Sequence, residues 1–277
     1  MAKKSSRMGG RTARQALRAA PIPEDEKSVR PGLQSGRYQP LTQHQVEQIH
    51  EAALTTLETI GFANALPSII ERVTAAGGTF TEDERLLIPR ALVEALSQCA
   101  KNVTLHAQDP RHDLDLSGSR TYFGTAGAAV HIVDTVKREY RESMTQDLYD
   151  AARIVDQMEH IHFFQRSMVL RDIEDPAEMD FNTCYVSIAG TSKHVGTSFV
   201  DPAHVHQAVD MLELIAGGEH AWRERPFVSC SCCFVVPPMR FAEDACRVLE
   251  ACVERGMPIL LLAAGQAGAT SPASLAG

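Results

Sequence analysis

The feature that most constrains this chain is a regular spacing of strand-like apolar segments in its second half. The segments start at residues 161, 194, 227 and 259, so successive starts are 33, 33 and 32 residues apart. Each interval between them carries the apolar periodicity of a helix. Strands that alternate with helices are typical of a parallel sheet with helical connections. The spacing therefore predicts an α/β fold.

The same period of about 33 residues also reduces the number of possible architectures. Helical repeat proteins also have periods near 33 residues, but they lack β-branched and aromatic runs such as Phe227 to Val236. Two arrangements remain, a doubly wound sheet and a (β/α)₈ TIM-type barrel. The regular spacing favours the barrel. A further strand-like segment, Tyr122 to Asp134, brings the number of expected strands to about five of eight.

The last twenty residues continue the repeat. An apolar run, Ile259 to Ala264, is followed by a Gly-rich turn from Gly265 to Gly268, and Ser271-Pro272 then has the pattern of a helix start. We therefore expect the chain to contain only the first strand-helix units of a barrel. An unclosed barrel of this kind is expected to be inactive by itself.

The first part of the chain is predicted to be helical. Thr42 and Gln45 have the spacing of a capping box, and the helix that follows is expected to end at Gly61. Its apolar face is predicted to consist of Val46, Ile49, Ala53, Leu57 and Ile60. Three regions are thus expected: a basic tail over 1–37, a helical lead-in over 38–120, and an incomplete barrel over 121–277.

The net charge and the cysteine residues indicate which partners and which cellular compartment to expect. The formal net charge of −8 argues against a nucleic-acid partner, which requires a basic surface. Seven cysteines in apolar or periodic segments indicate reduced thiols and a cytoplasmic location. No apolar stretch approaches the ~18 residues that span a bilayer, so no membrane is expected. The basic start resembles a mitochondrial transit peptide, although Gly9-Gly10 favours a plain basic tail.

Candidate functional residues are sought at the carboxyl ends of the expected strands, where both folds place their sites. His131, Gln165, Arg166 and Gln266 lie at or near such ends, and His194 is a further candidate at the start of its expected strand. Arg166 follows an apolar run and requires an anionic partner if it is buried. That partner is either Asp172 or the carboxylate of a substrate.

Two further patterns allow a structural and a functional interpretation. Gly124 to Gly127 lacks the residues of a P-loop and the glycine spacing of a dinucleotide site, which favours a close backbone approach at a strand bend. Cys230 and Cys232 share one face of a strand, and with His194 they form an alternative zinc ligand set. Small thiols also fill a core well.

Several segments taken together resemble the corrinoid-dependent trimethylamine methyltransferases, including the branch without pyrrolysine that uses quaternary amines such as glycine betaine. The similar segments are GGRTARQALR (9–18), GTAGAAVHIVD (124–134), REYRESMTQDLYDAARIVD (138–156), TSKHVGTS (191–198) and AAGQAGATSPASLAG (263–277). No single motif is diagnostic, but their order and spacing are specific.

This resemblance implies a complete (β/α)₈ barrel in the full-length protein and methyl transfer from a methylated amine to Co(I). The corrinoid (cobalamin) is carried by a separate partner protein, and no tightly bound metal is expected. We expect the full-length protein to be a homo-oligomer. Aromatic faces would hold the methylated ammonium group through cation–π contact, and Phe123 is expected to supply such a face.

No catalytic residue is assigned. The residues expected to bind the substrate are Phe123, His131, Gln165, Arg166, His194 and Gln266. Arg166 or His194 is expected to bind the carboxylate of a betaine. Two alternatives stay open: a zinc-dependent barrel methyltransferase that uses Cys230, Cys232 and His194, and a non-catalytic protein that serves in docking or oligomerisation.

Overall fold

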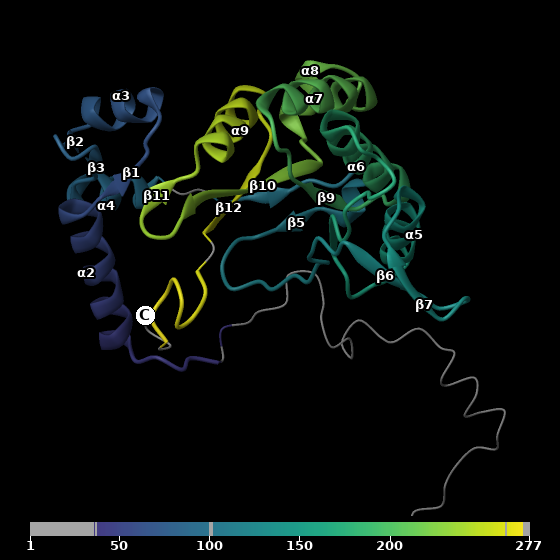
Figure 1. Cartoon of the computed structure of the whole chain (residues 1–277), viewed down its shortest axis with the longest axis horizontal. Coiled ribbons are helices and arrows are strands. Elements are labelled where there is room, and N and C mark those ends of the chain that lie inside the picture. The colour runs from purple at the N-terminus through teal and green to yellow at the C-terminus, as the bar shows by residue number, and fades with distance from the viewer. Residues whose placement is uncertain (1–35, 37, 100–101, 264, 274–277) are drawn as a thin grey trace, which may run out of the picture.

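The computed structural model describes residues 36, 38–99, 102–263 and 265–273 (Figure 1). The basic tail expected over 1–37 therefore lies almost entirely outside the described residues, as does the similar segment 9–18. Residues 271–273 are not helical, and the remainder of the helix expected after Ser271-Pro272 lies outside the described residues.

A parallel sheet forms the centre of the second half. Its strands are β8 (Phe163–Gln165), β9 (His194–Thr197), β10 (Val228–Val236) and β12 (Ile259–Ala263), paired in that order. The connecting helices are α6 (Pro176–Gly190), α7 (Pro202–Ala216), α8 (Glu219–Glu224) and α9 (Glu243–Glu254). The predicted α/β class and the strand-helix alternation are confirmed. The sheet stays open, and the described residues contain no closed barrel.

The helices cover one face of this sheet (Figure 1). The core between them includes Phe164 of β8, Val195 of β9 and Val228 of β10, all fully buried. Because side chains alternate along a strand, the neighbouring residues of β8, β9 and β10 point to the opposite face. In α7, Val205, Val209 and Leu212 are buried. α5 (Thr145–Asp156) packs against α6 on the same side.

The strand expected over Tyr122 to Asp134 is not continuous, and this prediction is wrong in part. Residues 122–130 follow β8 with isolated parallel bridges at Gly124–Phe163 and Ala129–Met168. The chain then forms a hairpin of β6 (His131–Asp134) and β7 (Glu139–Glu142). The Asp134 carboxylate accepts the backbone N–H groups of Val136 and Lys137, at 3.0 and 2.9 Å, which fixes the turn. This local turn chemistry was missed.

The glycines of this segment allow close packing, as the structural interpretation predicted. A Cβ at Gly124 would overlap the ring of Phe163, and one at Gly127 would lie 2.5 Å from the carbonyl oxygen of Ser167. Both positions therefore require glycine for close approach to β8 and to the residues after it.

Residues 43–98 of the lead-in contain three helices, the first of which is the helix predicted to end at Gly61, and three short strands that were not predicted. The helices are α2 (Gln43–Thr59), α3 (Pro67–Ala75) and α4 (Arg90–Gln98). The strands are β1 (Phe62–Ala63), β2 (Thr79–Phe80) and β3 (Arg85–Leu87). β1 pairs with β11 (Arg240–Phe241), which forms a hairpin with the end of β10, so the lead-in joins the central sheet.

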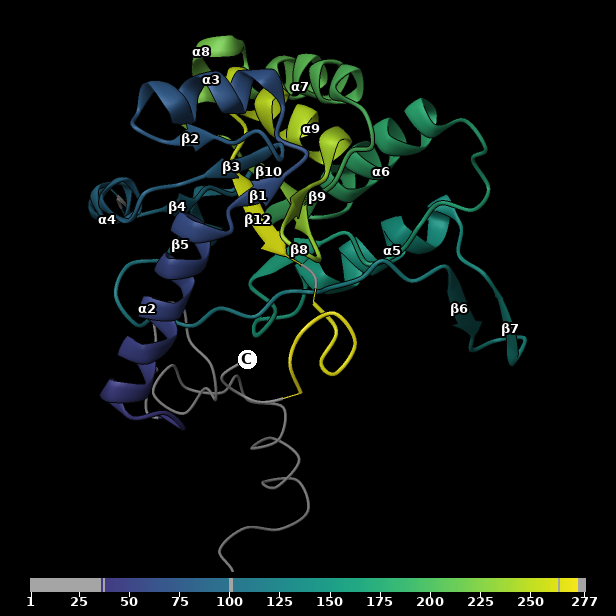
Figure 2. The same ribbon diagram turned by 60° about the vertical axis from the view of Figure 1, so that its left-hand side comes forward.

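The predicted apolar face of α2 is largely wrong. The capping box of Thr42 and Gln45 is present, and the helix ends before Gly61, whose φ is +60°. However, Val46 and Ile60 are exposed, and Leu54, outside the predicted face, is the buried side chain of the helix. α2 contacts α4 and β3 and stands away from the parallel sheet (Figure 2). Among the described residues, no helix has both the length and the apolar character needed to span a bilayer.

Candidate functional site

A large cavity lies on the face of the parallel sheet opposite the helices. Its volume is about 820 Å³, within the range of small-molecule sites. The strands contribute Phe163, Gln165, His194, Ser229, Ile259 and Leu260. The other side is formed by residues 103–122, which include β4 (Thr104–Leu105), the short helix η1 (Pro110–His112) and β5 (Leu114–Asp115). The sheet and residues 103–122, the covering segment, thus lie on two sides of a mostly apolar space.

His194 connects the sheet to the covering segment. Its Nδ1 lies 2.6 Å from the carbonyl oxygen of His106, and its Nε2 lies 2.9 Å from Oγ of Ser229. Because a carbonyl only accepts, Nδ1 carries the proton and Nε2 accepts the hydrogen bond that Ser229 donates. Burial lowers the pKa of His194 to about 4. The ring is therefore neutral near pH 7 and supplies no charge for a substrate carboxylate.

Gln165 is the second predicted residue in this cavity. It pairs with Gly196 on β9, and its side-chain amide lies directly over the Cα of that glycine. Within the described part of the chain, this amide has no hydrogen-bond partner, although its residue is only partly exposed. Gln165 thus offers both a free acceptor and free donors to a ligand.

Arg166 is not among the residues that line the cavity. It follows Gln165 at the end of β8, and burial lowers the pKa of its guanidinium, an effect that the charge of Asp180 on α6 opposes. Asp172, its predicted structural partner, instead accepts the backbone N–H of Thr145 at 2.9 Å. The structure therefore does not bring Arg166 and His194 together.

The remaining predicted binding residues are dispersed. Phe123 is half exposed, and its backbone exchanges hydrogen bonds with His162. His131 lies in β6 and stacks on Tyr140, with ring centroids 4.9 Å apart. Gln266 lies in the C-terminal turn, where its carbonyl oxygen accepts backbone N–H groups. None of these three residues lines the cavity.

The alternative zinc ligands are on opposite faces of the sheet. Cys230 and Cys232 are buried towards the helices, and Sγ of Cys232 lies 3.1 Å from the carbonyl oxygen of Ala245 on α9. His194 points to the other face, where Ser229 donates to it. Across the described residues, no group of three or more metal-ligating side chains is found. The geometry gives no support to the zinc alternative.

None of the described residues that line the cavity carries an unpaired positive charge. Arg120, the one charged residue of the lining, forms an ion pair with Asp115. The aromatic rings of Tyr122 and Phe163 line the space, and the Tyr122 hydroxyl donates to the Asp115 carbonyl oxygen at 3.0 Å. Aromatic faces and neutral acceptors of this kind favour a cationic ligand.

Ser229 and the covering segment were not predicted to form part of the site. Ser229 precedes Cys230 on the same strand, so strand alternation alone places it on the face that carries His194. The covering segment has two short alternating runs, Val103-Thr104-Leu105 and Leu114-Asp115-Leu116, whose leucines and valine line the cavity. This period of two is the signal that predicts a hairpin with one apolar face.

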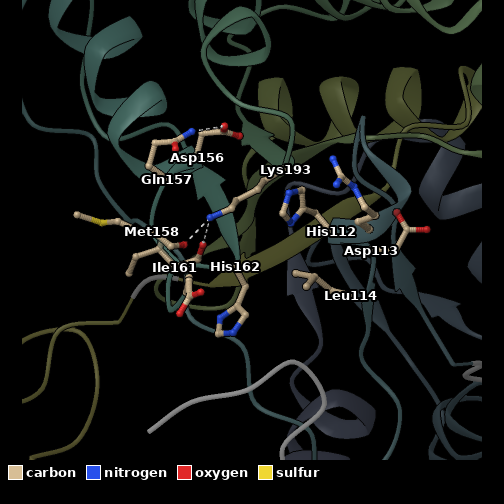
Figure 3. A pocket seen from close by; sticks show the side chains of 11 residues that line it. His112, Asp113, Leu114, Asp156, Gln157, Met158, Ile161, His162 and Lys193 are labelled. Carbon is tan, nitrogen blue, oxygen red and sulfur yellow. Dashed lines mark hydrogen bonds between the residues drawn. The ribbon is translucent and has the colours of Figure 1, made fainter. Parts of the chain in front are cut away.

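A smaller cavity of about 150 Å³ lies at the amino ends of the strands (Figure 3). Lys193, which is 3% exposed, points into this region. Its Nζ donates to the carbonyl oxygens of Val155, Met158 and Ile161 at 2.7, 2.6 and 2.7 Å. These bonds use all three ammonium protons and satisfy carbonyls at and beyond the end of α5. Lys193 is therefore a structural residue.

Comparison with known proteins assigns the family. The sequence profile described as "Trimethylamine methyltransferase (MTTB)" matches residues 7–277, nearly the whole chain. The chain belongs to this family. Curated relatives with methyltransferase names support the assignment.

Trimethylamine methyltransferase MttB of Desulfitobacterium hafniense (strain DSM 10664 / DCB-2) is 29% identical over 231 residues, which cover 83% of this chain and 46% of the relative. Glycine betaine methyltransferase of D. hafniense (strain Y51) is 27% identical over 243 residues, covering 87% and 50%. MttB of Methanosarcina thermophila is 25% identical over 244 residues, covering 85% and 50%. The chain thus spans about half the length of these curated relatives.

Proposed function

We propose that the protein is a methyltransferase that takes a methyl group from a methylated amine and delivers it to the Co(I) of a corrinoid. The corrinoid is the second substrate and is held by a separate protein. The family assignment and the names of the relatives support the methyltransferase class. The cavity of about 820 Å³, on the face of the sheet opposite the helices, is proposed to hold the amine.

The composition of the cavity carries this proposal. A methylated ammonium group has a diffuse positive charge and, when quaternary, no hydrogen to donate. Such a group is bound by aromatic faces and neutral oxygen atoms rather than by strong hydrogen bonds. Tyr122 and Phe163 supply the rings, and Gln165 and Ser229 supply oxygen atoms. The lining described above has no unpaired cation that would repel the ligand.

The same charges bear on the choice between the two substrates named for the relatives. Glycine betaine carries a carboxylate, which requires a cation or several donors. The two residues expected to bind it do not serve: His194 is neutral, and Arg166 lies outside the lining. We therefore propose a methylated amine without a carboxylate, such as trimethylamine, as the preferred substrate.

The proposed reaction requires little acid–base chemistry from the protein. The nitrogen–carbon bond breaks, its electron pair stays on nitrogen, and the amine leaves uncharged from an ammonium substrate. The corrinoid supplies the nucleophile for the methyl carbon. The task of the cavity is to orient the methyl group in line with that nucleophile, and positioning of this kind can remove roughly 7–11 kcal/mol of the barrier.

We further propose that β12 pairs with an additional parallel strand in the complete protein, as in a (β/α)₈ barrel. β12 pairs with β10 on one side, and its other edge has no partner strand among the described residues. Leu260 and Leu261, which point to opposite faces, are 51% and 54% exposed. Parallel strands are normally covered on both faces, and a free apolar edge favours further pairing.

The test is turnover by the full product of the reading frame that contains this chain. The protein is incubated with a reduced corrinoid protein and either trimethylamine or glycine betaine, and the demethylated amine is measured. We expect dimethylamine from trimethylamine at a rate at least about tenfold above dimethylglycine from glycine betaine. The two D. hafniense relatives serve as positive controls, each with the substrate of its name. Absence of both products from this protein, while the controls are active, would refute the proposal.

The zinc-dependent and docking alternatives are not favoured. The first lacks a ligand set on one face of the sheet, as described above. The second gives no reason for a cavity of about 820 Å³ lined by aromatic rings and free acceptors.

A further inference from the structure

We propose that the side-chain amide of Gln165 contacts the methylated ammonium group, and that Gly196 determines this contact by leaving the space in which the amide lies. The inference rests on the proposed function and names the residue pair that gives the cavity its preference for a cation. Neither residue has a role assigned by the comparisons.

The first observation is steric. A Cβ built on Gly196 would overlap Oε1 of Gln165 and would lie 2.7 Å from Cδ and 3.3 Å from Nε2. The backbone of Gly196 does not have a positive φ, so its conformation alone does not demand glycine. The close approach of the Gln165 amide is what requires a residue without a side chain here.

The second observation is that the backbone of both residues is held in place. Gln165 and Gly196 are partners in the β8–β9 ladder. The carbonyl oxygen of Gly196 accepts the N–H of Arg166 at 2.8 Å, and the carbonyl oxygen of Gln165 accepts a hydrogen bond from the Thr125 hydroxyl. The position of the amide therefore depends on its own torsions and on the space above Gly196.

The third observation concerns hydrogen bonding on the strand side of the cavity. His194 and Ser229 are bonded to each other, and His194 is also bonded to the covering segment. Phe163, Ile259 and Leu260 are apolar. Within the described chain, Gln165 is the strand residue of this lining whose polar side-chain atoms lack a protein partner. Its carbonyl dipole is thus available to a positive charge.

The inference is tested by a double-mutant cycle on the 277-residue chain with tetramethylammonium as the probe. The four proteins are the wild type, Gln165→Ala, Gly196→Ala and the double variant, and dissociation constants are measured by NMR titration. The methyl group of Gly196→Ala displaces only the end of a flexible side chain, so we expect this variant to fold. Thermal melting checks each protein.

We expect each single substitution to weaken tetramethylammonium binding by about three- to tenfold, the loss typical of one polar contact. In the Gln165→Ala background, Gly196→Ala should change the dissociation constant by less than about twofold, because the displaced amide is already absent. Multiplicative effects of the two substitutions, or no effect of Gly196→Ala in the wild type, would overturn the inference.

Two controls separate charge recognition from packing. Neopentane is a neutral molecule of nearly the same shape without hydrogen-bonding groups, and we expect its weaker binding to change by less than about twofold in both single variants. Equal losses for the two probes would overturn the inference in favour of packing. Gln146→Ala, which removes an exposed glutamine amide on α5, should leave both dissociation constants unchanged.

The outcomes also separate this inference from the proposed function. If the wild type does not bind tetramethylammonium, the inference is overturned, and the proposed function is judged by the turnover assay alone. If binding and the non-additive cycle are observed but the full reading-frame product does not turn over trimethylamine, the contact between Gln165 and the cation stands, and the proposed reaction fails.

Discussion

The helices α7 and α2 are of similar length, 15 and 17 residues, but they are held in the molecule in different ways. α7 connects two neighbouring parallel strands and packs against α6, α8 and α9, and four of its side chains are buried. α2 precedes the sheet, contacts α4 and β3, and buries Leu54 alone. A connection between adjacent parallel strands returns its helix to the sheet, whereas a helix that precedes the sheet has no such constraint.

Burial in this protein therefore follows chain connectivity as well as apolar periodicity. Both helices have apolar residues at helical spacing, and both begin with a side-chain cap. The strand-helix part, from α5 to β12, and the lead-in, from α2 to α4, should therefore respond differently to the same substitution. The predictions below compare matched residues of the two parts.

The largest difference is expected for leucine-to-alanine substitutions. Leu212 of α7 is fully buried, whereas Leu96 of α4 is 61% exposed. Leu212→Ala should lower the free energy of unfolding by ~2–5 kcal/mol, because it removes buried methyl groups and leaves a cavity. Leu96→Ala should change it by less than about 0.5 kcal/mol. Urea unfolding measures both, and equal losses would contradict the comparison.

A pH effect of nearly the same size is expected from the strand-helix part. Burial lowers the pKa of His194 from 6.5 to about 4 in the folded state. The stability linked to this neutral ring is fully present above pH 6.5 and is lost as the pH falls towards 4, because the unfolded chain binds the proton more readily. The loss is up to about 3 kcal/mol.

The check is the free energy of unfolding of the wild type and of His194→Gln between pH 7 and pH 4. The two curves should converge as the pH falls, since the variant has no ring to protonate. Parallel curves would show that His194 is not buried as a neutral group. The two histidines of α2, His44 and His50, are exposed.

Cations that bind backbone carbonyls give a third comparison. Lys193 donates to three carbonyls around the end of α5, and Arg85 donates to the carbonyls of Ile60 and Gly61 at the end of α2, at 2.8 and 2.6 Å. Lys193→Met should cost about 1–3 kcal/mol, because it leaves buried carbonyls unpaired. Arg85→Met should cost less than about 1 kcal/mol, because water replaces it. Thermal melting in the same buffer ranks the two variants.

The smallest difference is expected at the helix N-caps. Asp201 accepts the N–H of Ala203 in α7, and Thr42 accepts that of Gln45 in α2. Capping is local chemistry, so Asp201→Ala and Thr42→Ala should each cost about 0.5–2 kcal/mol. Asp201→Asn and Thr42→Ser should restore most of the loss. A difference above about 2 kcal/mol between the two alanine variants would show that the caps also depend on tertiary packing.

The features that were predictable from the sequence are those fixed by local chemistry or by repeated connections. The start of α7 at Asp201-Pro202, its end at Gly217 and the buried side chains of the helix follow from caps and periodicity. The order of β8, β9, β10 and β12 follows from the spacing of strand-helix units. These signals do not depend on distant parts of the chain.

The candidate site was only partly predictable. Gln165 and His194 were identified because they lie on expected strands. Arg166 directly follows Gln165, and neighbouring side chains of a strand point to opposite faces, so the two residues were not both to be expected in the cavity. The hydrogen bond from His194 to His106 joins residues 88 positions apart, and nothing local to either residue predicts it. The alternating pattern of the covering segment predicts a hairpin, but its position over the sheet became visible only in the structure.

The cavity between the parallel sheet and residues 103–122 is proposed to bind a methylated ammonium group. The most direct test is the measurement of intermolecular NOEs between the methyl protons of tetramethylammonium and the assigned chain. We expect NOEs to the ring protons of Phe163 and Tyr122 and to the methyl groups of Leu105, which line the cavity. NOEs to other surfaces alone, with none to these three residues, would contradict this proposal.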